Sequence, residues 1–245
     1  MIVGALIAVA LTGPPASVVP ANERAAFEAM LRTTALDADA KYGGGAICAE
    51  ASVEPASVEL IRLPGHPDIR AARARVKVTG CGRSSTENVT ALRVVGSPPW
   101  RMAAGAPGDS LADPSLQQNL WPILLADAAA QAPKGCQSHE LDDVYIAARP
   151  GHVALPAADD VNPAVRVGRI NIRLAPQAAA ERDKLDGSKA WVEVWPLKMC
   201  GLDRTQAILI VPLRDKAAVF HIEIPVWKIV EQYGPSAIPP PAPAE

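Results

Sequence analysis

Two matching Cys-Gly segments place the strongest constraint on how this 245-residue chain can fold. Cys81-Gly82 and Cys200-Gly201 each lie between two runs rich in β-branched and apolar residues. Aligned on Cys-Gly, Thr86 of the first segment matches Thr205 of the second. Glycine supplies the backbone angles that a tight turn needs, so each segment predicts a strand, a turn and a second strand. The similarity suggests an internal duplication, with chance likeness of two β-hairpins as the alternative.

One further cysteine precedes each segment, namely Cys48 and Cys136. An even number of cysteines in an exported protein is usually paired, although four cysteines allow three pairings. The duplication favours Cys48–Cys81 and Cys136–Cys200, one bridge in each half. The sequence has no Cys-x-x-Cys motif, so a zinc ribbon or a thioredoxin-like centre has no support, and we expect neither a metal nor a cofactor.

Residues 1–21 resemble a signal peptide, which is why we expect an oxidising compartment. Residues 2–11 form an uncharged apolar run, too short for the roughly 20 residues that cross a hydrocarbon core. Val19 and Ala21 are small enough at the −3 and −1 positions for cleavage before Asn22. No Lys or Arg precedes the run, and a buried N-terminal strand is the alternative. We expect a periplasmic or secreted protein without a transmembrane segment.

Composition excludes several other classes of protein. The chain carries a formal charge of −2, with 49 % hydrophobic and 20 % charged residues, which is typical of a folded globular protein and not of a disordered chain. A nucleic-acid-binding protein usually shows a basic excess, so the near-neutral balance argues against nucleic acid as a partner.

Two short segments resemble uncharacterised exported bacterial proteins. Trp191-Val-Glu193-Val-Trp195 followed by Cys200-Gly201 is similar to their Trp-x-Glu-x-Trp…Cys-Gly ending. Residues 108–117 are similar to a Gly-x-x-x-Ala-Asp-Pro-x-Leu-Gln segment of the same proteins. The resemblance covers these two segments and implies export and a β-rich fold. It implies no activity.

The pattern along the chain predicts an α+β fold of mostly antiparallel strands in two disulfide-bonded halves, with an N-terminal helix and a helix between the halves. Residues 22–133 form the first half and residues 134–234 the second. Asn22 is expected to cap the first helix, and Pro122 to kink or restart the second. The expected helices cover 23–41, 113–131 and 175–185. The expected strands cover 46–51, 57–62, 73–80, 88–95, 143–149, 165–174, 189–195, 206–213 and 217–225, before a disordered Pro-rich tail at 235–245.

Three groups of residues are candidate sites. Trp191, Glu193 and Trp195 alternate on one strand face, where two indoles around a carboxylate could bind a sugar or peptide, or pack as core with Glu193 tied to an arginine. His221 and Glu223 alternate in the same way and are weak acid–base candidates, with a polar outer strand face as the favoured alternative. The third group is an acidic cluster that could hold a divalent cation but that we interpret as a solvated turn; its members are His139, Glu140, Asp142 and Asp143.

Three weaker signals are interpreted structurally. Ser110 lies in a Gly-Asp-Ser-Leu signature of hydrolases, but it follows no hydrophobic strand and no Asp-x-x-His partner is present, so we expect a loop before a helix. Asn88-Val-Thr90 is a glycosylation sequon that a bacterial protein leaves unused. A basic strip could contact anionic polymers or lipid head groups, but the neutral total favours a solvated strand face; its members are Arg62, Arg70, Arg73, Arg75 and Lys77.

These observations favour a non-enzymatic binding or structural module of the bacterial cell envelope, with an envelope polymer, peptide or protein as partner. The alternative is a periplasmic hydrolase whose site is assembled from Glu193, His221 and Glu223.

Overall fold

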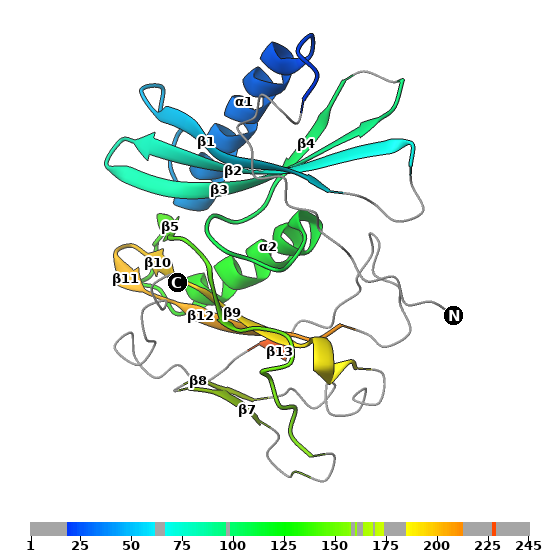
Figure 1. Cartoon of the computed structure of the whole chain (residues 1–245). Helices are drawn as coiled ribbons and strands as arrows, with labels where there is room; N and C mark the ends of the chain where they lie inside the picture. The colour runs from blue at the N-terminus through cyan, green and yellow to red at the C-terminus, as the bar shows by residue number, and fades with distance from the viewer. Residues whose placement is uncertain are drawn as a thin grey trace. The chain divides into compact units, whose positions relative to one another are not determined.

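A computed structural model describes residues 19–61, 67–96, 99–157, 160, 164–168, 170–173, 185–212 and 227–228. The fold is α+β, and every strand pairing in this part of the chain is antiparallel, as the sequence predicts. Contacts group the described residues into two compact units (Figure 1). One holds the chain up to Gly108 with Asp113–Gln118, and the other holds Asp109–Ala112 with the chain from Asn119 onwards. The grouping therefore changes around 108–119, whereas the sequence favoured a boundary at 133–135.

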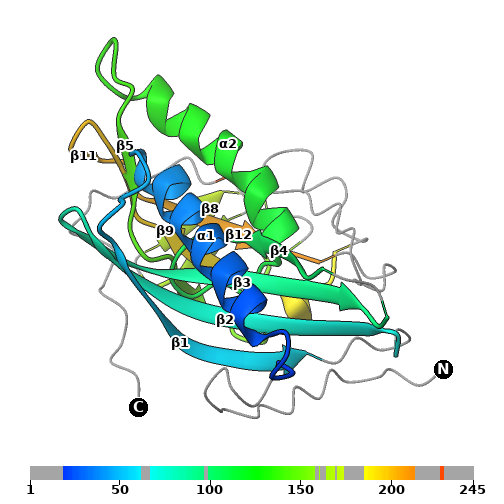
Figure 2. The ribbon, with the colours of Figure 1, turned by 90° about the horizontal axis from the view of Figure 1, so that it is seen from above.

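The first unit is a four-stranded meander covered on one face by helix α1 (Figure 2). Helix α1 spans Arg24–Gly43, and the strands follow in the order β1-β2-β3-β4. Their bounds are Ser52–Ile61 for β1, Ile69–Gly80 for β2, Arg83–Val94 for β3 and Arg101–Ala104 for β4.

Helix α1 buries one face at helical spacing, through Phe27, Leu31 and Ala35. It ends at Gly44, whose φ of 65° is the left-handed cap that glycine adopts without steric cost. Glu23 occupies the position before the helix without a side-chain cap, so the expected cap at Asn22 is wrong. The strand expected at 46–51 is also absent, because a turn from Cys48 to Ala51 brings Cys48 to its disulfide partner.

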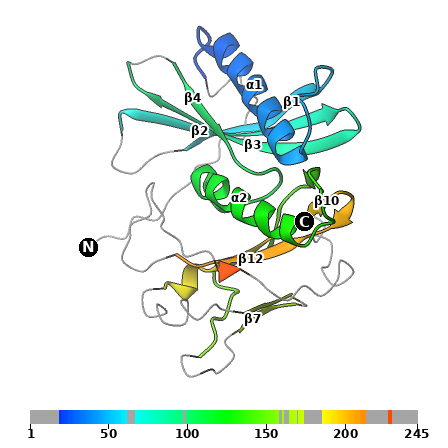
Figure 3. The same cartoon turned by 180° about the vertical axis from the view of Figure 1, so that it is seen from behind.

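The second unit is built around strands β9 and β12 (β12 is labelled in Figure 3), which the Cys200-Gly201 turn connects. Strands β9 (Trp191–Trp195) and β10 (Leu197–Met199) lead into the turn, and β11 (Leu202–Asp203) and β12 (Gln206–Ile210) follow it. The pairs Met199↔Leu202 and Trp195↔Gln206 keep one register along both arms. The four strands are therefore one long hairpin, interrupted at Pro196, which has no N–H to give to a ladder.

The remaining elements of this unit lie on the two sides of that hairpin. Strands β5 (His139–Leu141) and β6 (Tyr145–Ala148) pair with β10 and β9, and β13 (Trp227–Lys228) pairs with β12. Helix α2 (Pro114–Ala130) contributes its residues from Asn119 onwards, and a short 3-10 helix at Gly187–Lys189 precedes β9. Pro122 lies inside an uninterrupted α2, so the helix does not restart there, and the expected alternative of a kink stays a prediction.

Strand β9 is buried on both of its faces. Val192 and Val194 point into an apolar cluster with Val165 and Ile172 of a second hairpin, β7 (Ala164–Val167) and β8 (Ile170–Arg173). Figure 1 shows this hairpin on one side of β9 and β12, with α2 on the other. The single strand expected at 165–174 is therefore two strands, which turn at Gly168. The expected helix at 175–185, the strand at 217–225 and the tail lie outside the described residues, Leu185 excepted.

The two units repeat the same element order and the same register. Thr79 and Lys198 each lie two residues before the Cys-Gly turn, and they pair with Ser52 and Glu140. Those two partners each lie four residues after the first cysteine of their bridge, Cys48 or Cys136. A helix precedes that cysteine in both units, and a fourth strand pairs with the third at equivalent positions, Val89 and Ile208. The second unit differs by the insertion that carries β7 and β8.

Both predicted disulfides are present, Cys48–Cys81 and Cys136–Cys200. Cys81 and Cys200 have φ values of 48° and 50°, and the following Gly82 and Gly201 have 80° and 75°. Two successive residues with positive φ define the type I′ turn, whose twist matches the twist of the flanking strands. Among the described residues, no helix is both long and apolar enough to cross a membrane.

Candidate functional site

The carboxylate of Glu193 is the best-defined candidate group, and it lies in the interior of the second unit. Glu193 is at the middle of β9 and is 0 % exposed. Trp191 and Trp195 point to the same side because strand side chains alternate. Their indole N–H groups donate to the two carboxylate oxygens, Trp191 to Oε1 at 2.8 Å and Trp195 to Oε2 at 3.3 Å.

The loop before helix α2 supplies the other donors. The hydroxyl of Ser110 donates to the Glu193 carboxylate, with distances of 2.9 Å and 3.0 Å to its oxygens. The backbone N–H groups of Leu111 and Ala112 donate to Oε1 at 2.8 Å and 3.3 Å. Hydrogen bonds to an ionised acceptor are the strong ones, and several together compensate a carboxylate for its lost water.

This geometry brings together the two segments that carry the sequence resemblance. Glu193 is the centre of the Trp-x-Glu-x-Trp segment, and residues 110–112 belong to the Gly-x-x-x-Ala-Asp-Pro segment. The next residue, Asp113, caps helix α2 by accepting from the N–H groups of Ser115 and Leu116 at 2.8 Å and 3.0 Å. Gln117 of the same segment is buried and accepts from the N–H of Ala106. These side chains therefore satisfy backbone N–H groups at the start of α2 and in the loop before it.

The structure decides between the two predicted roles of Trp191 and Trp195, an aromatic binding platform and core packing. Trp191 is 6 % exposed and Trp195 is 0 % exposed, so they pack as core and present no open aromatic platform. The expected arginine partner of Glu193 is replaced by two indoles, a hydroxyl and two backbone N–H groups. Ser110 donates to this carboxylate inside a loop that precedes a helix, as the structural interpretation of the Gly-Asp-Ser-Leu signature expects.

Two carboxylates of the predicted acidic cluster pair with Lys198, a residue that the sequence analysis did not connect with the cluster. The Nζ atom of Lys198 lies 2.8 Å from Asp142 and 3.8 Å from Glu140. The hydrogen bond that Lys198 donates to the Asp142 carboxylate is the largest influence that raises the pKa of Lys198. His139 packs edge-on against Trp121 with its ring centroid 5.4 Å away. The described residues contain no group of three or more metal-ligating side chains.

A second buried polar cluster lies in the first unit, and no sequence motif predicts it. Asp39 on α1 accepts a hydrogen bond from Ser85 at 2.9 Å and pairs with Arg83 at 3.1 Å. Glu87 and Tyr42 are both 0 % exposed. Burial, and next the negative charge of Glu87, raise the pKa of Tyr42 well above its usual range. This cluster joins the end of α1 to β3, so its geometry is that of a structural link.

The basic strip divides between the two faces of the first sheet, because Arg70 and Arg73 lie three residues apart on β2 and so point to opposite sides. Arg73, Arg75 and Lys77 alternate along β2 on the face opposite α1, because Ala72, Ala74, Val76 and Val78 take the core positions. Glu59 lies across from Arg73, and Glu54 lies across from Lys77. Arg73 and Lys77 are exposed, as a solvated strand face requires, and Arg62 lies outside the described residues.

The remaining candidates are placed as follows. Asn88 of the sequon is half-buried, and its amide donates to the carbonyl oxygens of Ala106 and Gly108. His221 and Glu223 lie outside the described residues, so their role in the hydrolase alternative stays a prediction. No protein-family model, no curated protein and no solved structure matches this chain. The class of the protein therefore rests on its own geometry, a duplicated α+β unit with one disulfide in each copy.

Proposed function

We propose that this protein is a non-enzymatic, exported module of the bacterial cell envelope that binds an anionic envelope polymer. The hydrogen bonding and burial of Glu193 support the non-enzymatic part of this proposal. Its two oxygens accept from five donor groups in a buried position, so proton transfer to or from a substrate would first require the loss of several of these hydrogen bonds.

Export is supported by the two disulfides. Disulfides persist in oxidising compartments and are rare in the cytosol, so a chain whose four cysteines are all bridged fits the periplasm or the cell exterior. The apolar run at residues 2–11 is compatible with this route.

The binding part of the proposal rests on the polar face of the first sheet. Arg73, Arg75 and Lys77 lie two residues apart on β2, so their charges repeat every 6–7 Å or so along the strand. On the β1 side two glutamates lie across from the end members of this row, whereas on the β3 side Thr86 and Thr90 lie across from Lys77 and Arg73 and add hydroxyl groups. A regular row of cations beside hydroxyl groups suits a polymer with one anionic group in each repeating unit.

Binding and thermal-shift measurements on the oxidised full-length protein test the function. We expect polygalacturonate to bind and to raise the melting temperature, with affinity that falls as salt rises, whereas neutral dextran has no effect. The double variant Arg73→Glu, Lys77→Glu should lose binding, while Glu54→Gln, on the same face, should keep it. Equal binding of dextran, or full binding by the double variant, would refute the polymer assignment.

Hydrolysis of ester or glycoside substrates is the readout for the alternative. We expect no turnover above background by the wild-type protein. Turnover that is lost in both Glu193→Gln and His221→Ala, with the folded state retained, would overturn the non-enzymatic proposal in favour of the hydrolase.

A further inference from the structure

The two disulfides occupy equivalent positions in the two units but have different surroundings. Cys81 and Cys200 are both exposed, but Cys48 is 6 % exposed and belongs to the apolar core of the first unit, whereas Cys136 is half-buried. Exposure controls the access of an attacking thiolate to a disulfide. The two bridges therefore differ at their first sulfur, to which a thiolate has more access in Cys136 than in Cys48.

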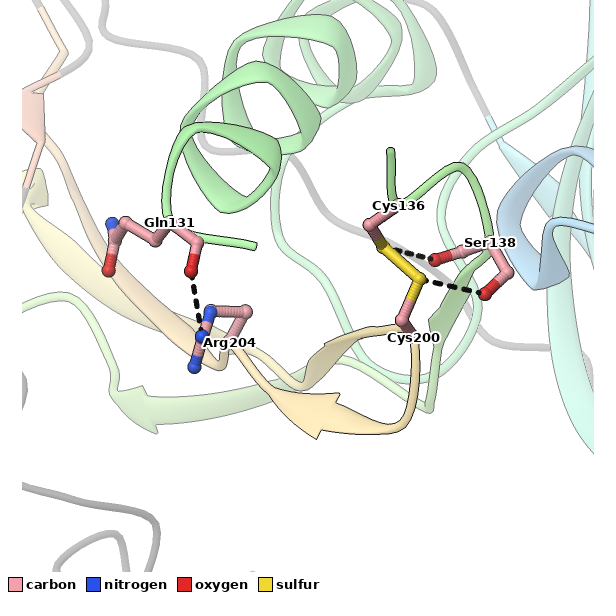
Figure 4. The surroundings of a disulfide bond; sticks show 5 residues. All are labelled: Gln131, Cys136, Ser138, Cys200 and Arg204. Atoms are coloured by element: carbon pink, nitrogen blue, oxygen red, sulfur yellow. Dashed lines mark hydrogen bonds between the residues drawn. A yellow bond between two sulfur atoms is a disulfide. The ribbon is translucent and has the colours of Figure 1, made fainter. Parts of the chain in front are cut away.

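Ser138 distinguishes the second bridge further. Its hydroxyl lies 3.4 Å from Cys200 Sγ and can donate to that sulfur, while its carbonyl oxygen lies 3.6 Å from Cys136 Sγ (Figure 4). The backbone N–H of Cys200 donates to the same carbonyl at 3.0 Å, which holds the two segments together. The residue at the equivalent position of the first unit, two after its cysteine, is the exposed Glu50, which offers no hydroxyl.

We propose that Cys136–Cys200 is a thiol–disulfide exchange site for a dithiol partner and that Ser138 selects which sulfur leaves. A thiolate of the partner attacks Cys136 Sγ, a new sulfur–sulfur bond forms, and the Cys136–Cys200 bond breaks with its electron pair on Cys200 Sγ. The Ser138 hydroxyl donates to this developing thiolate, which then takes a proton from water. The second thiol of the partner, as its thiolate, attacks the mixed disulfide and releases Cys136, so the partner is oxidised and the protein gains two electrons and two protons.

The local structure limits what this exchange releases. Strand β5 pairs with β10 through three residues, and β10 pairs with β11 through two. The guanidinium of Arg204 donates a hydrogen bond of 2.8 Å to the carbonyl oxygen of Gln131, just after α2, and this bond does not depend on the disulfide (Figure 4). Reduction therefore removes the covalent link between the segment around residues 132–141 and the hairpin tip, while the hydrogen bonds of β5 with β10 and the pairing of β9 with β12 remain. The proposal is independent of the polymer-binding function.

Timed reduction of the oxidised full-length protein tests the proposal. The protein is treated with dithiothreitol, quenched with N-ethylmaleimide, and its peptides are mapped by mass spectrometry. We expect Cys136 and Cys200 to be labelled about tenfold faster than Cys48 and Cys81. Equal rates for the two bridges, or faster labelling of Cys48 and Cys81, would overturn the proposal.

Glutathione, a monothiol, tests the identity of the attacked sulfur. We expect the glutathione adduct on Cys136 with the maleimide on Cys200, and the reverse distribution would contradict the assignment of the leaving group. The variant Ser138→Ala should be reduced roughly threefold to tenfold more slowly. A merely structural role for Ser138 predicts the opposite, since a loosened segment is reduced faster. Ser84→Ala, which removes an exposed hydroxyl near the other turn, should leave the rate unchanged.

Discussion

At the scale of single residues, the buried carboxylate of Glu193 shows how a group that resembles a catalytic acid serves the fold. The donors that surround it, from β9 and the 110–112 loop, are all neutral groups. Removing one member of such a buried set leaves the others unsatisfied, which costs more than the intact set contributes.

The variant Glu193→Ala should therefore destabilise the second unit by about 3–5 kcal/mol in urea unfolding, because it leaves buried N–H groups without an acceptor. Glu193→Gln keeps one acceptor oxygen and should cost less, about 1–2 kcal/mol. The exposed strand residue Glu54 provides the control, and Glu54→Gln should change stability by less than about 0.5 kcal/mol. A Glu193→Ala cost as small as that of the control would contradict the structural role.

Glu23 should make the first unit sensitive to acid. The side-chain hydrogen bond from Arg93 is the largest influence on this carboxylate and lowers its pKa. A carboxylate whose pKa is lower in the folded protein stabilises the fold above the unfolded pKa, near 4.3, and loses that contribution as the pH falls through the folded pKa. Unfolding measured from pH 7 to pH 2 should show a shallower acid loss in Glu23→Gln than in the wild type. An equal loss of stability at low pH in the wild type and in Glu23→Gln would refute this role.

At the scale of elements, the Cys-Gly hairpins were predictable because their signals are local. A glycine after cysteine and the runs on both sides indicated a turn between strands, and both turns have the positive φ angles of type I′. The start of α2 was also predictable from Asp113-Pro114, a cap followed by proline at the first helical position. The turn at 48–51 was mistaken for a strand, because its apolar residues contact the core through a loop.

The two turn glycines should each be required for their backbone conformation. No neighbouring atom lies within 4 Å of a β-carbon added at Gly82 or Gly201, so an alanine there meets only the cost of positive φ. Gly82→Ala and Gly201→Ala should each destabilise by about 1–2 kcal/mol in urea unfolding. Gly45→Ala is the matched control, because that position is equally open and has no positive φ. Equal effects at all three positions would rule out the conformational explanation.

At the scale of the whole molecule, the described chain is a tandem repeat with one bridge in each copy. The bridges close loops of 33 and 64 residues. On the chain-entropy model these loops correspond to about 3.7 and 4.3 kcal/mol of stabilisation. Because each bridge joins residues of one unit, its effect should be confined to that unit.

Hydrogen–deuterium exchange on paired cysteine variants checks this assignment. Cys136→Ser with Cys200→Ser should speed exchange in β5, β10 and β11 and leave the β2–β3 ladder unchanged. Cys48→Ser with Cys81→Ser should speed exchange at the ends of β2 and β3 next to the Cys81-Gly82 turn and leave β5, β10 and β11 unchanged. Faster exchange spread evenly over both units in either variant would show that the units do not open separately.

The sequence by itself determined the α+β class and the two Cys-Gly hairpins, since these follow from turn residues and patterns within short segments. The likeness of the two hairpins favoured the pairing of the cysteines, which the structure confirms. Only the tertiary structure decided how the chemically suggestive side chains are used. Glu193 contacts Ser110 across 83 positions of sequence, and Lys198 on β10 contacts Asp142, which directly follows the paired strand β5. Such contacts depend on strand register and on where the connecting loops cross, and these are set by packing of the whole unit and not by any local pattern.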